Sequence, residues 1–503
     1  MRKIKKSSGL LSVKGVASLF LSPLLFFILA SCDSRENLNI LIITADTLRS
    51  DHLGCYGYER NTSPRIDELA LKGFHFMGAF CPIDLTNPSH ISIFTSKYPK
   101  NHGVYTNWTP MEKEHVTLAE ILKNQGYKTA ALVSSNHLNT NISGLGKGFD
   151  FFRSISLGQV PANETINNAL SWIRENADKN FFVWVHLFDP HMPYNPPSPY
   201  DKVFDKRYNG WGKIFFDVYN HKISARNAMS TSKEELTQSQ KDVLLKAEQG
   251  TLPYSDICFN RIGLTEKDME YVKSLYDGEI KFMDENIGVL FKEMDTLGLS
   301  KKTIIIFTAD HGESLGEHGI YCDHKGLYEN TIHIPFIIYV PGMTHRKINS
   351  TVLNMDILPT VLDLLHINVS SEINDGFDGK SLIPLMDGST EKVRDLFFME
   401  QKNNLAKSIR QGDYKFIMPI KENFIPLEDD YIHQEEMYDL GNDIGERNNL
   451  IASGTLDTTP YEVLKATLTA WAGKEWRVKR DSKQLKRLDE EQREKLKALG
   501  YIN

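Results

Sequence analysis

The chain has 503 residues, of which 41% are hydrophobic and 24% are charged, so it is long enough to bury a large core. Its formal net charge of -7 excludes the strongly basic surface by which many proteins attract nucleic acid. An anionic substrate must therefore be recognised by local side chains and not by the overall charge.

The N-terminus has the pattern of an export signal. Basic residues up to Lys14 precede an apolar stretch at 16–30, which is short for a membrane span of ~20 residues. The stretch ends in Leu-Ala-Ser-Cys, which resembles a bacterial lipobox with Cys32 in its last position. We predict a lipoprotein signal peptide at 1–32, cleaved before Cys32, with acylation of that cysteine. The rest of the chain would be exported and membrane-anchored, facing the periplasm or the cell surface; an uncleaved signal anchor is the alternative.

The first strand is expected at 38–44, an apolar run rich in β-branched residues and too short for a helix of useful length. The strand is followed closely by Asp46. After a polar loop, a helix is expected at 64–71 with Ser63 as its N-cap. A loop and a short apolar helix at 85–99 come next.

Two further strands precede the middle of the chain. An amphipathic helix at 116–125 leads into a strand at 127–134, and a buried strand is expected at 181–187. His186 alternates with apolar residues in the last of these, as a core histidine does, and Asp189 follows the strand.

The segment at 196–265 lacks the regular hydrophobic patterns of the strands and helices before it. Patchy helical periodicity occurs only at 231–249. Long irregular insertions in compact domains are usually functional or disordered, so we predict a cap over the substrate site. A long helix is then expected at 266–297. Its carboxylates, among them Asp277 and Asp284, are interpreted as a solvated face and not as catalytic groups.

A second buried strand with a polar end is expected at 304–307, followed by Asp310 and His311. Open α/β sheets hold their ligands beyond the carboxyl ends of the strands, and Asp46 follows the first strand in the same way. Carboxylates and imidazoles are good ligands for a divalent cation. We therefore predict a metal site of Asp46, Asp310 and His311, whereas an isolated Asp-His-Gly would fit a helix cap and a loop histidine.

From residue 393 onward the sequence has the pattern of several short strands. This pattern predicts a small antiparallel sheet. We predict a main domain at 33–392, including the insertion at 196–265, and a C-terminal subdomain at 393–503. The remaining elements are expected at 335–340 (strand), 355–365 (helix), 396–400, 406–410 and 414–419 (strands) and 488–501 (helix).

Several motifs, spaced in the same order, resemble the sulfatase family within the alkaline phosphatase superfamily. The family signature is a nucleophile, any residue, Pro, Ser and a basic residue, and here it reads Thr86-Asn87-Pro88-Ser89-His90. The resemblance runs from about residue 38 to the C-terminus. It implies an α/β fold, namely a three-layer α/β/α sandwich with a large mixed, mostly parallel sheet, plus a small C-terminal antiparallel sheet and helix.

This resemblance implies a metal-dependent hydrolase that cleaves a sulfuric ester bond in a small molecule or a glycan. The expected cation is Ca²⁺, with Zn²⁺ and Mn²⁺ as alternatives. Thr86 would be the nucleophile and a metal contact. The other residues carried over from the family would orient or stabilise the ester; they are His90, His137, His191 and Lys325. The oligomeric state is not readable from the sequence.

Three positions depart from the family pattern. Thr47 stands where a second aspartate is usual, and His90 replaces the usual arginine. Thr86 occupies the place of a cysteine or serine that is oxidised to formylglycine. Because the Cβ of Thr86 carries a methyl group, oxidation would give a ketone, so Thr86 would attack as a metal-activated alkoxide, as in phosphodiesterase and phosphonate-cleaving relatives.

Alternative functions therefore remain open at the level of the sequence. The first is hydrolysis of phosphoric mono- or diesters or of phosphonates, and the second is a non-catalytic glycan-binding lipoprotein. The presence of Asp46, Asp310 and Lys325 argues against the second. Two further questions stay open: whether a second metal site forms from Asp189, His186 or His324, and whether disulfides form among Cys55, Cys81, Cys258 and Cys322.

Overall fold

The computed structural model describes residues 38–154, 160–232, 235–420 and 434–473, which all belong to one compact unit. The predicted signal peptide with Cys32, and the helix expected at 488–501, lie outside the described residues. In the part of the chain that the structure describes, no helix is both long and apolar enough to cross a membrane. The four cysteines in the same part carry free thiols.

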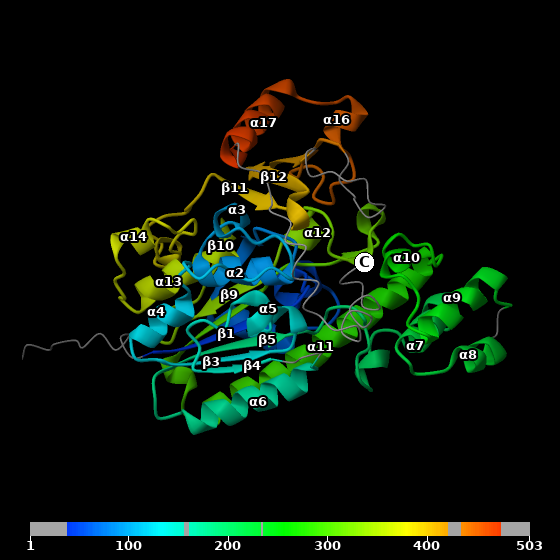
Figure 1. The fold of residues 1–503 in the computed structure, drawn as a ribbon, viewed down its shortest axis with the longest axis horizontal. Helices are drawn as coiled ribbons and strands as arrows, with labels where there is room; N and C mark the ends of the chain where they lie inside the picture. The colour runs from blue at the N-terminus through cyan, green and yellow to red at the C-terminus, as the bar shows by residue number, and fades with distance from the viewer. Residues whose placement is uncertain (1–37, 155–159, 233–234, 421–433, 474–503) are drawn as a thin grey trace, which may run out of the picture. The chain divides into compact units, whose positions relative to one another are not determined.

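An eight-stranded sheet forms the middle layer of the main domain (Figure 1). Its central strands are buried at every residue, as expected for parallel strands covered by helices on both faces. All neighbours are parallel except the two pairs that involve β9, so the sheet is mixed and mostly parallel. Its strands, in spatial order, are β10 (Arg346–Leu353), β2 (Phe74–Phe80), β9 (Phe336–Tyr339), β6 (Thr303–Ala309), β1 (Asn39–Ala45), β5 (Phe181–Leu187), β3 (Lys128–Val133) and β4 (Phe151–Arg153).

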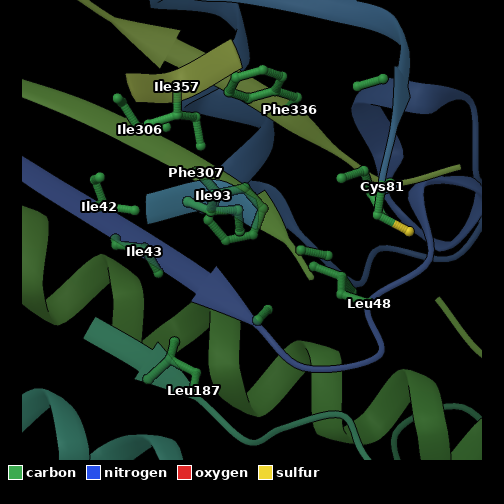
Figure 2. Packing of buried hydrophobic residues seen from close by; sticks show 14 of the residues in the cluster. Ile42, Ile43, Leu48, Cys81, Ile93, Leu187, Ile306, Phe307, Phe336 and Ile357 are labelled. Atoms are coloured by element: carbon green, nitrogen blue, oxygen red, sulfur yellow. The ribbon is translucent and has the colours of Figure 1, made fainter. Parts of the chain in front are cut away.

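Helices cover the sheet on both faces, which gives the three layers predicted from the sequence (Figure 1). One face carries α1 (Pro64–Lys72), α6 (Ala162–Glu175) and α11 (Glu266–Thr296), and the other carries α2 (Thr86–Thr95), α4 (Leu118–Asn124) and α13 (Ile357–Leu364). Figure 2 shows Ile42 of β1 and Phe307 of β6 packed near Ile93 of α2. Each of these side chains is fully buried, and such burial stabilises the fold by roughly 1.5–3 kcal/mol per side chain.

The carboxylates of α11 are buried, so the prediction of a solvated face was wrong. Asp277 forms an ion pair with Arg60 at 2.7 Å and accepts a hydrogen bond from Tyr58 at 2.8 Å. Asp284 accepts from the backbone N–H groups of Arg65 and Ile66, at the start of α1. These partners lie more than 200 positions away in the chain, as the 217 between Arg60 and Asp277 illustrates. The periodicity of α11 alone could not reveal them.

The described residues of the insertion at 196–265 contain four α-helices, where the sequence indicated mostly irregular structure; the third of them lies within the patchy helical periodicity noted at 231–249. They are short, so each offers only about one to three turns of periodicity to a sequence pattern. The hydroxyl of Tyr254, in the last of them, donates to the carbonyl oxygen of Cys322 at 2.5 Å. The insertion therefore contacts the segment that carries Lys325. The helices are α7 (Trp211–Tyr219), α8 (Ala225–Thr231), α9 (Gln238–Glu248) and α10 (Tyr254–Cys258).

The C-terminal segment forms the predicted small antiparallel sheet. Its strands are β11 (Leu396–Glu400), β12 (Ala406–Gln411), β13 (Tyr414–Pro419) and β14 (Glu436–Asp439), with α17 (Thr458–Ala472) packed on β12 and β13. The remaining short elements are α3 (Pro99–His102), α5 (Thr140–Ser143), β7 (Ser314–Leu315), β8 (Tyr321–Asp323), α12 (Glu329–Ile332), α14 (Ser371–Asn374), α15 (Ile383–Met386) and α16 (Leu450–Ser453).

Arg394 anchors the start of this C-terminal segment. Its guanidinium donates to both oxygens of Asp356 at 2.6 Å, and both side chains are buried. Because removal of one partner leaves a buried charge uncompensated, we expect Arg394→Met to lower the free energy of unfolding by about 3–5 kcal/mol in urea denaturation. The control is Lys392→Met, which breaks the exposed pair with Asp395 and should change that free energy by less than about 1 kcal/mol. Equal losses in the two variants would contradict this role of Arg394.

Candidate metal and nucleophile site

Two adjacent strands bring Asp46 and Asp310 to the same edge of the sheet. Strands β1 and β6 are parallel and pair Ala45 with Ala309, so the residues that follow them emerge side by side. One oxygen of Asp310 accepts from the backbone N–H of Thr47 at 3.2 Å. Thr47 itself has a left-handed φ of 54°, which costs a β-branched residue about 1–3 kcal/mol and is typical of functional sites.

Thr86 is the first residue of α2, and its hydroxyl lies 3.4 Å from Nε2 of His311. The hydroxyl of Ser89 donates to the backbone carbonyl oxygen of Asp310 at 2.8 Å, which ties α2 to the end of β6. Thr86 is 1% exposed and therefore faces the interior of the site. The start of a helix also favours an anion at this position.

The Nε2 atom of the His311 ring faces the carboxylates. The Nδ1 atom of the ring donates to the carbonyl oxygen of Gly312 at 3.0 Å, so in the neutral ring Nε2 carries a lone pair. That nitrogen lies 3.5 Å from Asp310 Oδ2 and 3.9 Å from Asp46 Oδ1. Lone pairs on nitrogen and on carboxylate oxygen repel one another unless a cation lies among them. Metal-bound histidines commonly donate their other ring N–H to a carbonyl in this way.

The donor set of this site fits a divalent cation. Both oxygens of Asp46, the Oδ2 atom of Asp310 and the hydroxyl of Thr47 are buried without a hydrogen-bond partner among the described residues. Burial, reinforced by the neighbouring Asp310, raises the pKa of Asp46 well above its usual value. Burial opposes the ionisation of Asp310 too, but His311, His90 and His186 together lower the pKa of Asp310. Such buried acceptors cost about 1–3 kcal/mol each when nothing compensates them, and a bound cation would satisfy them together.

His90 lies next to Thr86, and both of its ring nitrogens are hydrogen-bonded. Its Nδ1 donates to the carbonyl oxygen of Thr86 at 2.7 Å, and its Nε2 accepts from the hydroxyl of Thr44 at 3.0 Å. Burial lowers the pKa of His90 to about 3, so the ring is neutral. His90 thus braces the first turn of α2, where the family pattern led us to expect a group that holds the ester.

His324 and His191 extend the site beyond His311. The rings of His311 and His324 have their centroids 4.3 Å apart, and the His324 and His191 centroids are 6.1 Å apart. The Nδ1 atom of His324 donates to the carbonyl oxygen of Asp84 at 2.7 Å, and that of His191 donates to the carbonyl oxygen of Met192 at 2.5 Å. Burial lowers the pKa of His191 to about 4. Both rings are therefore held in fixed orientations at one wall of the site.

Lys325 lies beside Asp323, and His137 lies beside Asn107. The ammonium of Lys325 is 2.9 Å from Asp323 Oδ2 and 5.6 Å from the centre of the Phe259 ring, which follows α10. His137 lies 3.4 Å from the side-chain amide nitrogen of Asn107, and the carbonyl oxygen of that amide accepts from the backbone N–H of Asn87 at 2.9 Å. Asn107 therefore links His137 to α2.

The sequence analysis did not identify several residues of the site. Glu313 is fully buried, and neither carboxylate oxygen has a hydrogen-bond partner among the described residues. Burial, followed by the charge of Asp323, raises the pKa of Glu313 well above its usual value. The one clue to these two residues in the sequence was their nearness to predicted site residues. Glu313 follows the Asp310-His311-Gly312 turn, and Asp323 comes two residues before Lys325. Asn107 had no signal in the sequence, since it acts only through contacts between distant segments.

The structure is an α/β/α domain with a candidate cation site beside the hydroxyl of Thr86 at the start of α2. The family model described as "Sulfatase" matches residues 38–367, and the model described as "N-sulphoglucosamine sulphohydrolase, C-terminal" matches 316–471. An arylsulfatase of Clostridium perfringens is 25% identical over 477 residues, which cover 82% of this chain and 90% of that protein.

Two solved structures resemble the fold. One, described as a complex with its substrate D-glucosamine-2-N,6-O-disulfate, aligns with a TM-score of 0.65 and 22% identity over 90% of this chain and 99% of the other. The phosphonate monoester hydrolase of Agrobacterium radiobacter aligns with a TM-score of 0.62 and 20% identity over 86% of this chain and 95% of that one. This chain belongs to the sulfatase family and is a sulfuric ester hydrolase. The predicted family and fold are thereby confirmed.

The cation site predicts a metal-dependent stability. A ligand that binds only the folded chain raises the melting temperature by mass action, so Ca²⁺ or Zn²⁺ added to the chelator-treated protein should raise it in differential scanning calorimetry. The Asp310→Asn variant should lose most of that increase, because it removes the carboxylate charge that faces both Asp46 and His311.

Asp378→Asn is the matched control, since Asp378 bonds to Tyr98 and Asn101 outside the site. Its metal-induced increase should equal that of the wild type. An undiminished increase in Asp310→Asn would contradict a cation at this position.

Proposed function

We propose that this chain hydrolyses the sulfate ester of a glycan or small molecule by covalent catalysis at Thr86, with a divalent cation held by Asp46, Asp310 and His311. The observation that carries the proposal is the position of the Thr86 hydroxyl, 3.4 Å from His311 Nε2, beside carboxylate oxygens that lack hydrogen-bond partners. The family membership and the sulfated sugar bound by the structurally similar protein support a sulfated substrate.

A bound divalent cation would supply positive charge that acidifies a neighbouring hydroxyl and stabilises an anionic ester oxygen. In the first step the Thr86 oxygen forms a bond to sulfur as the bond from sulfur to the alcohol oxygen breaks. The proton that Thr86 loses balances the one that the departing alcohol gains. Lys325, held by Asp323, supplies a compact positive charge for the non-bridging sulfate oxygens.

In the second step, water attacks the sulfur atom and restores the Thr86 hydroxyl, with release of sulfate. His191 is suited to accept a proton from this water. Its Nδ1 is committed to the Met192 carbonyl oxygen, so Nε2 is the basic nitrogen. Because burial lowers the pKa of His191 to about 4, the ring is uncharged at neutral pH and offers Nε2 as an acceptor for this proton. We assign His90 to positioning Thr86 and His137 to the wall of the substrate site.

A phosphoric mono- or diester, or a phosphonate, is a candidate for an additional substrate beside the sulfuric ester. The observation that favours it is Thr86 itself, since an unmodified hydroxyl suits phosphoryl transfer and cannot become a formylglycine aldehyde. The structural likeness to a phosphonate monoester hydrolase agrees with this candidate at the level of the fold. A tetrahedral oxyanion ester of either element fits the same arrangement of charges.

The role of Thr86 is tested by assaying an aryl sulfate beside aryl phosphate mono- and diesters. Thr86→Ala should lower kcat/KM for the preferred ester by at least about 10³-fold, because the bond-forming oxygen is lost, while Thr86→Ser keeps part of the activity. The control is Thr95→Ala, in the same helix, whose hydroxyl only bonds to the Ile91 carbonyl oxygen. Turnover of any ester that is unchanged in Thr86→Ala would contradict the proposal.

We also propose that the protein is exported and anchored to a membrane through acylated Cys32. The support is the basic and apolar N-terminal pattern that ends in Leu-Ala-Ser-Cys. The Cys32→Ser variant should remain unprocessed and lose the lipid, which electrophoresis and metabolic labelling with palmitate would detect. Cys55→Ser, which removes a half-buried thiol of the folded domain, should be labelled like the wild type. Labelling that persists in Cys32→Ser would contradict acylation at this residue.

A further inference from the structure

His186 lies at the floor of the cation site, in the strand next to the one that leads to Asp46. Strand β5 pairs with β1 so that His186 stands beside Thr44. The side chain of His186 is fully buried, and its Nε2 atom is 3.6 Å from Asp46 Oδ2. A ligand nitrogen of His186 also lies within 4.8 Å of an Asp310 oxygen. The ring therefore faces both carboxylates of the site.

The hydrogen bonds of Ser134 fix which nitrogen of His186 carries the proton. The hydroxyl of Ser134 donates its one hydrogen to the backbone carbonyl oxygen of His186, at 2.5 Å. The same hydroxyl lies 3.2 Å from His186 Nδ1, so it must accept there, and Nδ1 is the N–H of the ring. In the neutral ring Nε2 is therefore a bare lone pair, and it has no hydrogen-bond partner among the described residues.

This places a second imidazole nitrogen near the carboxylates. His186 forms a ligand cluster with Asp310 and His90, next to the cluster of Asp46, Asp310 and His311, and the two clusters share Asp310. A lone pair 3.6 Å from a carboxylate oxygen is repulsive, and a cation between them turns the repulsion into coordination. His90 does not share this property, although it lies in the same cluster. Its Nδ1 proton is committed to Thr86 and its Nε2 lone pair to Thr44, so neither atom can ligate.

We propose that His186 is a metal ligand through Nε2, and that the nitrogens of His186 and His311 make the centre prefer Zn²⁺ or a similar transition metal over Ca²⁺. The inference rests on the cation site of the proposed function and adds its fourth protein ligand and its metal class. Imidazole nitrogen suits Zn²⁺, whereas Ca²⁺ prefers an all-oxygen environment. The nitrogen of His186 would thus replace, as a ligand, the carboxylate of the second aspartate that is usual at the position of Thr47.

The test compares the metal affinities of the full-length protein after chelator treatment. The variant His186→Asn keeps a donor for Ser134 near the place of Nδ1 and removes Nε2. We expect it to bind Zn²⁺ about 100-fold more weakly than the wild type, with Ca²⁺ affinity changed less than about threefold. Its Co²⁺ complex should also change in visible absorption, because the spectrum reports the nitrogen ligands directly and without turnover.

Two further variants keep the result interpretable. His75→Gln alters a buried histidine on β2 outside the site, and it should bind Zn²⁺ and Co²⁺ like the wild type. The Asp310→Asn variant should bind every tested cation more weakly than the wild type. If Asp310→Asn weakens binding but His186→Asn leaves Zn²⁺ affinity and the Co²⁺ spectrum unchanged, the inference about His186 is overturned while the cation site stands. If neither variant affects binding, the cation site of the proposed function fails as well.

Discussion

The close approach of the buried carboxyl groups of Asp46 and Asp310 is the constraint on which the rest of the site depends. The two carboxylates follow neighbouring parallel strands, so the sheet forces them together where water cannot solvate them. Two like charges in such a place cannot both ionise without compensation. The protein surrounds them with imidazoles and backbone N–H groups, and it leaves several of their oxygens without a donor. These carboxylate oxygens without hydrogen-bond donors are the physical basis for the proposed cation.

The same constraint explains how Thr86, the proposed nucleophile, is held. The hydroxyl of Ser89 bonds to the backbone of Asp310, and His90 binds the carbonyl oxygen of Thr86, so the first turn of α2 is attached to the strand ends on two sides. His90, which stands where the family usually has an arginine, then has a structural role. Its hydrogen bond to the carbonyl oxygen of Thr86 positions the proposed nucleophile, while Lys325, paired with Asp323, is proposed to supply the positive charge for the substrate.

Much of the fold could be predicted because its central strands are continuous apolar runs. Residues 38–44, 181–187 and 304–307 each mark a buried parallel strand, and the Asp46 and Asp310 ends of two of them indicated the site. Three of the four α-helices of the insertion were missed because they are short, and only α9 fell within the helical periodicity noted at 231–249. The buried carboxylates Asp277 and Asp284 were misread because a one-dimensional pattern cannot show a partner from another segment. His186 was interpreted as a core histidine, and only the hydrogen bonds of Ser134 reveal the nitrogen it presents.

The most direct measurement is a mass spectrum of the protein quenched during turnover of an aryl sulfate, after proteolysis, with the peptide that contains Thr86 isolated. Covalent catalysis predicts a sulfo group on the Thr86 oxygen, present in the metal-loaded protein and absent when chelator is added before substrate. A single turnover in isotopically labelled water should leave that oxygen unlabelled. Label in the Thr86 hydroxyl, or sustained turnover with an unmodified Thr86 peptide and direct attack of water on sulfur, would contradict the account.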